Sequence, residues 1–118
     1  MYKLPTHIAI GAASYEVHLE GEDWYRAHDC VGMVDKEEFT IHLYFEGRPA
    51  ADCLNTLIHE LLHVCYQEYN IKPKCAEERT VTSLGYAMSS LLVQNPWLLD
   101  SFELMVEEAR HVKRTRTA

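Results

Sequence analysis

Two histidines and a glutamate stand in an H-E-x-x-H pattern near the middle of the chain, as His59-Glu60-Leu61-Leu62-His63. Residues four apart share one face of a helix, about 5–6 Å apart at Cβ, so both imidazoles can reach one ion. Zinc binds imidazole nitrogen at about 2.0 Å, and a catalytic site has three protein ligands and a water. Glu60 is offset around the helix and can take a proton from that water, whose pKa zinc lowers to about 7. The pattern therefore predicts zinc ligands at His59 and His63 and a general base at Glu60.

A third ligand is expected from an acidic residue after the motif. No glycine stands three residues after His63 and no histidine six residues after it, which excludes the metzincin pattern. Glu77 and Glu78 open the next expected helix, and either carboxylate would complete a His-His-Glu site. Acidic residues in a first helical turn also interact favourably with the helix dipole. This is the purely structural explanation for the presence of Glu77 and Glu78 there. Glu68 is a weaker candidate, because it lies about 140° around the motif helix from His63.

The residues around the motif predict a helix over about 50–69. Pro49 suits the start of a helix, Asn70 can adopt the left-handed conformation that ends one, and Pro73 prevents its continuation. Apolar residues cover most of the circumference, which predicts a central and buried helix. The side chains expected to be buried are those of Leu54, Leu57, Ile58, Leu61, Leu62 and Cys65.

Strands are expected before this helix. Residues 7–20 form two short runs around a Gly-Ala-Ala-Ser break, and in the second run Tyr15, Val17 and Leu19 alternate with polar residues, which predicts a hairpin. Residues 30–47 predict a second hairpin that turns near Asp35-Lys36-Glu37, and its second strand, 39–45, is rich in aromatic and β-branched residues. Residues 21–29 fit either a loop or a single helical turn.

Two further helices are expected after the motif, over about 76–93 and 96–112. The first has an apolar stripe of Val81, Leu84, Met88, Leu91 and Leu92, and the second one of Leu98, Leu99, Phe102, Met105, Val106 and Ala109, which we expect to face inward. Strands followed by helices predict an α+β fold, with a small antiparallel or mixed N-terminal sheet followed by three helices, the motif helix being central. A length of 118 residues fits one domain, 1–118, whose last residues, about 110–118, form a basic and solvated end.

Composition excludes several classes of protein. A formal net charge of −7 argues against nucleic acid as a partner. The first residues lack the apolar region of a secretory signal, and no apolar run approaches the roughly 20 residues of a membrane span, so we expect a cytoplasmic protein without membrane attachment.

The 4 cysteines form no C-x-x-C pair, and we expect free thiols, with Cys53 and Cys65 buried. No histidine outside the motif stands at a ligand spacing; these are His7, His18, His28, His42 and His111.

Residues from about 39 to 96, with "TLIHELLHVCY" followed by "EERTVTSLGYAMSSLLVQNP", resemble zincin metallopeptidases of the gluzincin type. More closely, they are similar to small phage- and prophage-encoded H-E-x-x-H proteins, distant relatives of the ImmA/IrrE-type metallopeptidases. The resemblance implies a minimal zincin-like fold and, for a phage-encoded protein, the host cytoplasm.

The gluzincin resemblance also bears on the third ligand. In gluzincins the ligand glutamate is often followed four residues later by an acid or amide and then by an apolar-small pair. Counting from Glu78 puts Thr82 at that position and Leu84-Gly85 at the pair. Counting from Glu77 puts Val81 at that position, and the pair is then no longer an apolar residue followed by a small one. The resemblance therefore favours Glu78 over Glu77, with Thr82 as a departure from the usual acid.

The resemblance further implies that an extended peptide adds to an edge strand beside the metal helix, and residues 39–45 are the candidate for that strand. Tyr86 and His42 are candidate oxyanion stabilisers by position alone.

The function expected is that of a zinc metallopeptidase acting on a protein or peptide through a zinc-bound water, with Glu60 as base. The alternative is a zincin-like zinc-binding module that recognises a protein without turnover. A metal-free helical interaction domain is the third possibility.

Overall fold

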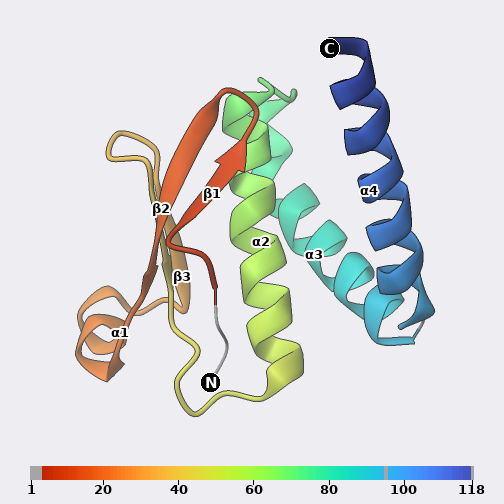
Figure 1. Cartoon of the computed structure of the whole chain (residues 1–118). Coiled ribbons are helices and arrows are strands. Elements are labelled where there is room, and N and C mark those ends of the chain that lie inside the picture. The colour runs from red at the N-terminus through yellow and green to blue at the C-terminus, as the bar shows by residue number, and fades with distance from the viewer. Residues whose placement is uncertain (1–3, 95, 118) are drawn as a thin grey trace.

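Two β-hairpins lie side by side to form one mixed sheet of four strands (Figure 1). The computed structural model describes residues 4–94 and 96–117, and of these it leaves out the side chains of 91, 101 and 112–117. The first hairpin joins β1 (His7–Ile10) to β2 (Ala13–Leu19), and the second joins β3 (Gly32–Asp35) to β4 (Thr40–Leu43). Both hairpins were predicted, the first from alternating side chains in its second strand and the second from its turn and its aromatic and β-branched residues.

The two hairpins meet through a parallel pairing of β2 with β4, so the strand order is β1-β2-β4-β3. A parallel pair needs a crossover, and here the chain passes through α1 (Glu22–His28). This segment is a two-turn helix rather than a loop or a single turn, and it has acidic residues in its first turn and basic residues in its last.

The prediction that residues 39–45 form the edge strand is wrong. β4 lies between β2 and β3, and its Ile41 and Leu43 are fully buried. The edge beside the motif helix is instead β3. Local sequence indicates a strand but says little about its neighbours, since the position of β4 depends on the distant residues of β2.

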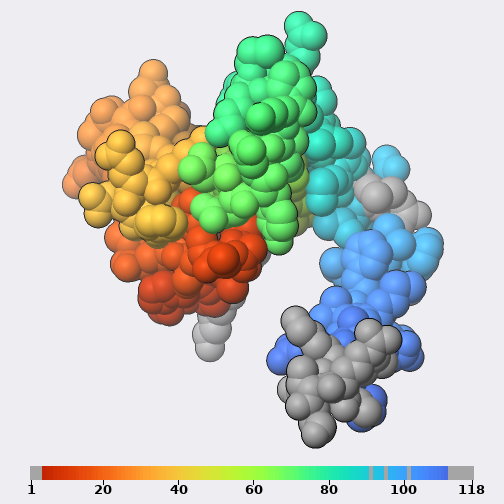
Figure 2. Space-filling model, turned by 90° about the horizontal axis from the view of Figure 1, so that it is seen from above, coloured from red at the N-terminus to blue at the C-terminus, as the bar shows by residue number. Residues whose placement is uncertain are grey.

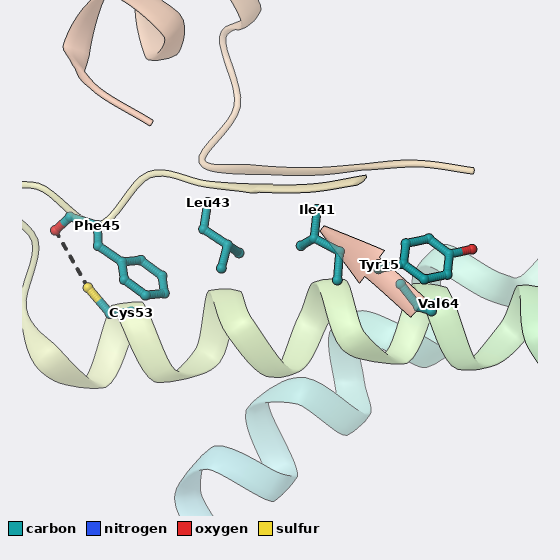
Figure 3. Close-up of a cluster of buried hydrophobic side chains, with 6 residues drawn as sticks. All are labelled: Tyr15, Ile41, Leu43, Phe45, Cys53 and Val64. Atoms are coloured by element: carbon teal, nitrogen blue, oxygen red, sulfur yellow. Dashed lines mark hydrogen bonds between the residues drawn. The ribbon is translucent and has the colours of Figure 1, made fainter. Parts of the chain in front are cut away.

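The motif helix α2 (Ala50–Glu68) packs across one face of the sheet (Figure 1). Pro49 precedes it, and Asn70 follows it with a positive φ of 50°, as predicted. Between α2 and the sheet lies the hydrophobic core, with Tyr15 and Val64 at one end and Phe45 and Cys53 at the other (Figure 3). Burying these side chains fixes the rotation of α2, and therefore the direction in which the other side of α2 points.

The prediction of burial along α2 is correct only in part. Ile58 is buried, but five of the predicted side chains are half-buried: Leu54, Leu57, Leu61, Leu62 and Cys65. The helix is central, since the sheet covers one side of it and α3 (Glu77–Gln94) covers another.

The prediction of an inward apolar stripe on α3 is correct only in part: Val81 is buried and Leu92 is half-buried, whereas the side chain of Leu91 lies outside the described residues. Small residues supply the rest of the buried face. Leu84 and Met88 are exposed, whereas Val81, Gly85 and Ser89 are buried. A Cβ added to Gly85 would lie 3.3 Å from Asn55 Oδ1 and 3.8 Å from His59 Cα. The missing side chain at Gly85 therefore lets α3 lie close to the motif histidines.

The last helix, α4 (Trp97–Thr117), extends away from the sheet and from α2 (Figures 1 and 2). The prediction that its apolar stripe faces inward is wrong: Leu98 is half-buried, but Leu99, Phe102, Met105 and Val106 are exposed, and so is Ala109. An amphipathic stripe identifies a face but not a partner. The predicted basic end at 110–118 falls in α4 up to Thr117, and its side chains from 112 onward lie outside the described residues.

Among the described residues no helix is long and apolar enough to cross a membrane. All four cysteines are free thiols; Cys53 is buried as predicted, whereas Cys65 is half-buried.

Candidate metal centre

The two motif histidines lie on successive turns of α2, on the side away from the core. Both are mostly buried, with exposed side-chain fractions of 21% for His59 and 17% for His63. Their Nε2 atoms lie 3.2 Å apart. Two nitrogens that each lie about 2.0 Å from a tetrahedral zinc ion are separated by about 3.3 Å. The imidazoles therefore already have the spacing of two ligands to one ion.

The first turn of α3 brings Glu78 to the same point. One of its carboxylate oxygens lies 3.2 Å from His59 Nε2, and the other lies 2.9 Å from His63 Nε2. One ligand atom from each of these three residues lies within 4.8 Å of the others. Thr82, one turn along α3, donates to Glu78 Oε1 at 3.4 Å rather than contacting a histidine. Two imidazoles and one carboxylate are a donor set that suits zinc.

The neighbouring Glu77 contacts the other side of His63. Its Oε2 lies 2.7 Å from His63 Nδ1, and it is also 3.8 Å from Lys36 Nζ in the β3–β4 turn. A carboxylate that accepts from Nδ1–H leaves the lone pair on Nε2 and fixes the ring orientation. The two acidic residues thus take different positions: Glu78 faces the two Nε2 atoms, and Glu77 supports one ring from behind.

Glu68 lies away from this group. Its Oε2 accepts a hydrogen bond of 2.9 Å from the Tyr15 hydroxyl on the sheet. It therefore has a structural partner and does not compete with Glu78 for the motif histidines.

Glu60 lies beside the histidines in a pocket of about 390 Å³. Only 7% of its surface is exposed. Burial raises its pKa to about 7, partly offset by His63 and reinforced by Glu78. Burial also lowers the pKa of His59, although Glu78 opposes this. At neutral pH the site therefore combines an unprotonated imidazole with a carboxyl group that can both accept and return a proton.

The edge strand makes room for this carboxyl group at Gly32. A Cβ at Gly32 would lie 2.6 Å from Glu60 Oε2 and 2.9 Å from its Cδ and Cγ. Sequence reasoning missed Gly32, although a glycine within a strand is a known sign of close approach. It also missed the rest of the pocket lining, which comprises Cys30, Val31, Asn55 and Thr56.

The two oxyanion candidates do not line this pocket. Tyr86 is largely exposed on α3 and lines a different hollow, with Ser89 and Ser90. His42 alternates with the core residues Ile41 and Leu43 on β4 and so points from the opposite face of the sheet. Neither position supports the predicted role.

Since Glu60 is the expected general base, replacing Gly32 with alanine should reduce the expected peptide cleavage while leaving the candidate metal ligands in place. The new methyl group would overlap Glu60 and displace its carboxylate from the pocket. We expect turnover to fall roughly 10- to 100-fold, as a misplaced catalytic group commonly causes, with zinc content unchanged. Gly21→Ala is the control, because a Cβ there would meet only Glu46 Oε2, at 3.8 Å. Equal activities of the two variants would contradict the expectation.

The metal-free protein should lose stability as pH rises, because of Glu60. Its pKa in the folded state is about 7, above the ordinary 4.5, so the folded state binds that proton more tightly than the unfolded state does. This stabilisation is complete below pH 4.5 and is lost as pH rises through 7. Glu60→Gln cannot ionise, so in a chelator at pH 8 it should be more stable than the wild type by roughly 3 kcal/mol. Urea unfolding at pH 5 and pH 8 measures this, and a difference independent of pH would contradict it.

Comparisons with protein-family models, with curated proteins and with solved structures gave no match. The interpretation of the site therefore rests on its geometry and on the chemistry of its donors.

Proposed function

We propose that this protein is a zinc-dependent metallopeptidase in which His59, His63 and Glu78 hold zinc and Glu60 is the general base. The observation that carries the proposal is the convergence of three ligating side chains on the same pocket as a buried carboxyl group with a pKa of about 7. A glutamate that is 7% exposed is uncommon in a purely structural helix, since its ionised form is poorly solvated there.

Each residue has a distinct part in the proposed reaction. Bound zinc would supply a Lewis acid that polarises the substrate carbonyl and acidifies water. Glu60 accepts a proton from the attacking water as the new C–O bond forms, and then gives it to the leaving amine as the C–N bond breaks. Glu60 must first accept the proton and then release it, and its place beside His59 and His63 in the same pocket puts it within reach of both steps. Glu77 keeps the ring of His63 oriented throughout.

An extended peptide is the substrate class that fits the surroundings of the site. Strand β3 is at the edge of the sheet, and residues at its start, Val31 and Gly32, line the pocket together with Cys30. A free edge can accept a peptide as a further strand through main-chain hydrogen bonds. A peptide paired with β3 would therefore run past Glu60.

Zinc content and peptide cleavage test this proposal. Protein purified without a histidine tag and without added metal should contain about one zinc per chain by elemental mass spectrometry. It should cleave members of a peptide mixture, and a chelator should abolish the cleavage until zinc is restored. Bound zinc without cleavage of any peptide would favour the zinc-binding recognition module. Absence of zinc, with no thermal stabilisation when zinc is added, would exclude both functions.

A further inference from the structure

A second group of metal-ligand side chains lies on the face of the sheet opposite to α2. It consists of His18 and Glu20 from β2 and His42 from β4, which we call the sheet-face cluster. One ligand atom from each residue lies within 4.8 Å of the others. The sequence alone gave no sign of it, because no histidine there is at a ligand spacing along the chain.

The pairing of the two central strands creates this cluster. β2 and β4 run parallel with His18 directly opposite His42. Side chains two apart on a strand share a face, so Glu20 lies on the same side as His18. The alternate positions, Tyr15 and Ile41, point into the core and hold both strands in register. The ligand groups are therefore carried by the two innermost strands of the sheet.

The contacts within the cluster match those of ligating residues and their supports. His42 Nδ1 lies 2.5 Å from Glu20 Oε2, and Thr40 Oγ1 lies 3.3 Å from the other ring nitrogen. His18 Nε2 lies 2.7 Å from Glu16 Oε1. Glu16, which is not one of the three grouped residues, is placed as the outer carboxylate that holds one nitrogen of a ligating histidine, whereas Glu20 is one of the three candidate ligands themselves.

Charge and access also favour a cation. Glu16 and Glu20 bring two carboxylates to two imidazoles, so the group is negatively charged when the imidazoles are neutral. The exposed side-chain fractions are 38% for His18, 20% for His42 and 21% for Glu20. The cluster is thus partly withdrawn from water yet open to an ion from solution.

We propose that the sheet-face cluster binds a divalent transition-metal ion through His18, Glu20 and His42. Two imidazoles with one carboxylate suit Zn²⁺, Co²⁺, Ni²⁺ and Cu²⁺ better than Ca²⁺ or Mg²⁺, which prefer oxygen ligands alone. The bound ion would join β2 to β4, the one parallel pairing in the sheet. It shares no residue with the motif site, so the two sites can be tested separately.

Trp24 on α1 provides an optical reporter for this cluster. Its ring stacks on that of His42, with centroids 5.6 Å apart and planes 17° from parallel. A paramagnetic ion on His42 should quench Trp24 emission. The other tryptophan, Trp97, is on α4. The emission that Trp24→Phe loses is the part of the signal that comes from Trp24.

The test uses Co²⁺ as the probe on untagged full-length protein that carries His59→Gln and His63→Gln to remove the motif site. We expect one Co²⁺ per chain at micromolar concentration, by calorimetry and visible absorption, together with quenching of Trp24 emission. Adding His42→Gln should weaken binding at least tenfold and remove the quenching. His7→Gln, on the exposed end of β1, is the matched control and should change neither.

Glu20→Gln is the second variant, and it decides the result if His42→Gln fails to fold. Circular dichroism without metal establishes that each variant keeps its structure. The proposal is overturned if the parent variant binds no Co²⁺ at micromolar concentration, or if neither His42→Gln nor Glu20→Gln changes binding and quenching. Wild-type protein that binds one Co²⁺, with the same affinity after His59→Gln and His63→Gln, would support the sheet-face cluster and count against the proposed peptidase.

Discussion

Glu60→Gln should reduce peptide cleavage by roughly 10²- to 10⁴-fold, the usual contribution of a general acid–base group, while about one zinc per chain remains bound. Glutamine has almost the same shape as glutamate and can occupy the space beside Gly32, but it cannot accept a proton from water. The proposed ligands His59 and His63 lie on successive turns of α2, and their contacts with Glu78 and Glu77 of α3 do not involve Glu60. The loss should therefore appear in kcat, measured by single-turnover cleavage of a peptide identified from a mixture.

The matched control for Glu60→Gln is Glu107→Gln, which makes the same chemical change on the exposed surface of α4. It should leave both zinc content and cleavage unchanged. Normal cleavage by Glu60→Gln would refute the mechanism. Loss of zinc from Glu60→Gln would instead show that Glu60 helps to hold the ion, which its position beside the histidines does not predict.

The local features of the sequence predicted the elements that carry the site. The spacing of His59 and His63 requires only a helix, and Pro49 and Asn70 mark its two ends correctly. The first hairpin was predicted from alternation, because a half-buried strand shows its period within a few residues, and the second from its turn and its aromatic and β-branched residues. Features that depend on neighbouring residues in the chain were therefore accessible before the fold was known.

Features that depend on distant segments were not accessible. Gly32 makes room for Glu60 only because β3 lies against α2. A glycine in a strand signals a close approach, but nothing near Gly32 in the sequence identifies α2 as the element that approaches. His18 and His42 are adjacent only through the parallel register of β2 and β4. The apolar stripe of α4 was recognised, but its exposure depends on the angle at which the chain leaves α3. Sequence patterns identify faces, whereas tertiary contacts decide what each face meets.

The choice between Glu77 and Glu78 illustrates the same limit, because both begin the same helix and only their directions separate them. Glu78 faces the Nε2 atoms of both histidines, and its side chain is 70% exposed, so it approaches the ligand point from the solvent side. Glu77 is 15% exposed and lies between His63 Nδ1 and Lys36. We therefore expect different consequences when each carboxylate is replaced by an amide.

Glu78→Gln should weaken zinc binding by more than 100-fold, since it removes a charged ligand, whereas Glu77→Gln should weaken it roughly 10- to 100-fold, as is usual for outer partners. Competition with a chromophoric chelator at fixed pH measures both affinities. The amide at position 77 can still contact His63, but it accepts more weakly and leaves the imidazole less basic, so some zinc should remain bound at saturating metal. Cleavage by Glu77→Gln should then recover as zinc is added, while cleavage by Glu78→Gln should not. A larger loss of affinity in Glu77→Gln than in Glu78→Gln would reverse the two assignments and make Glu77 the ligand.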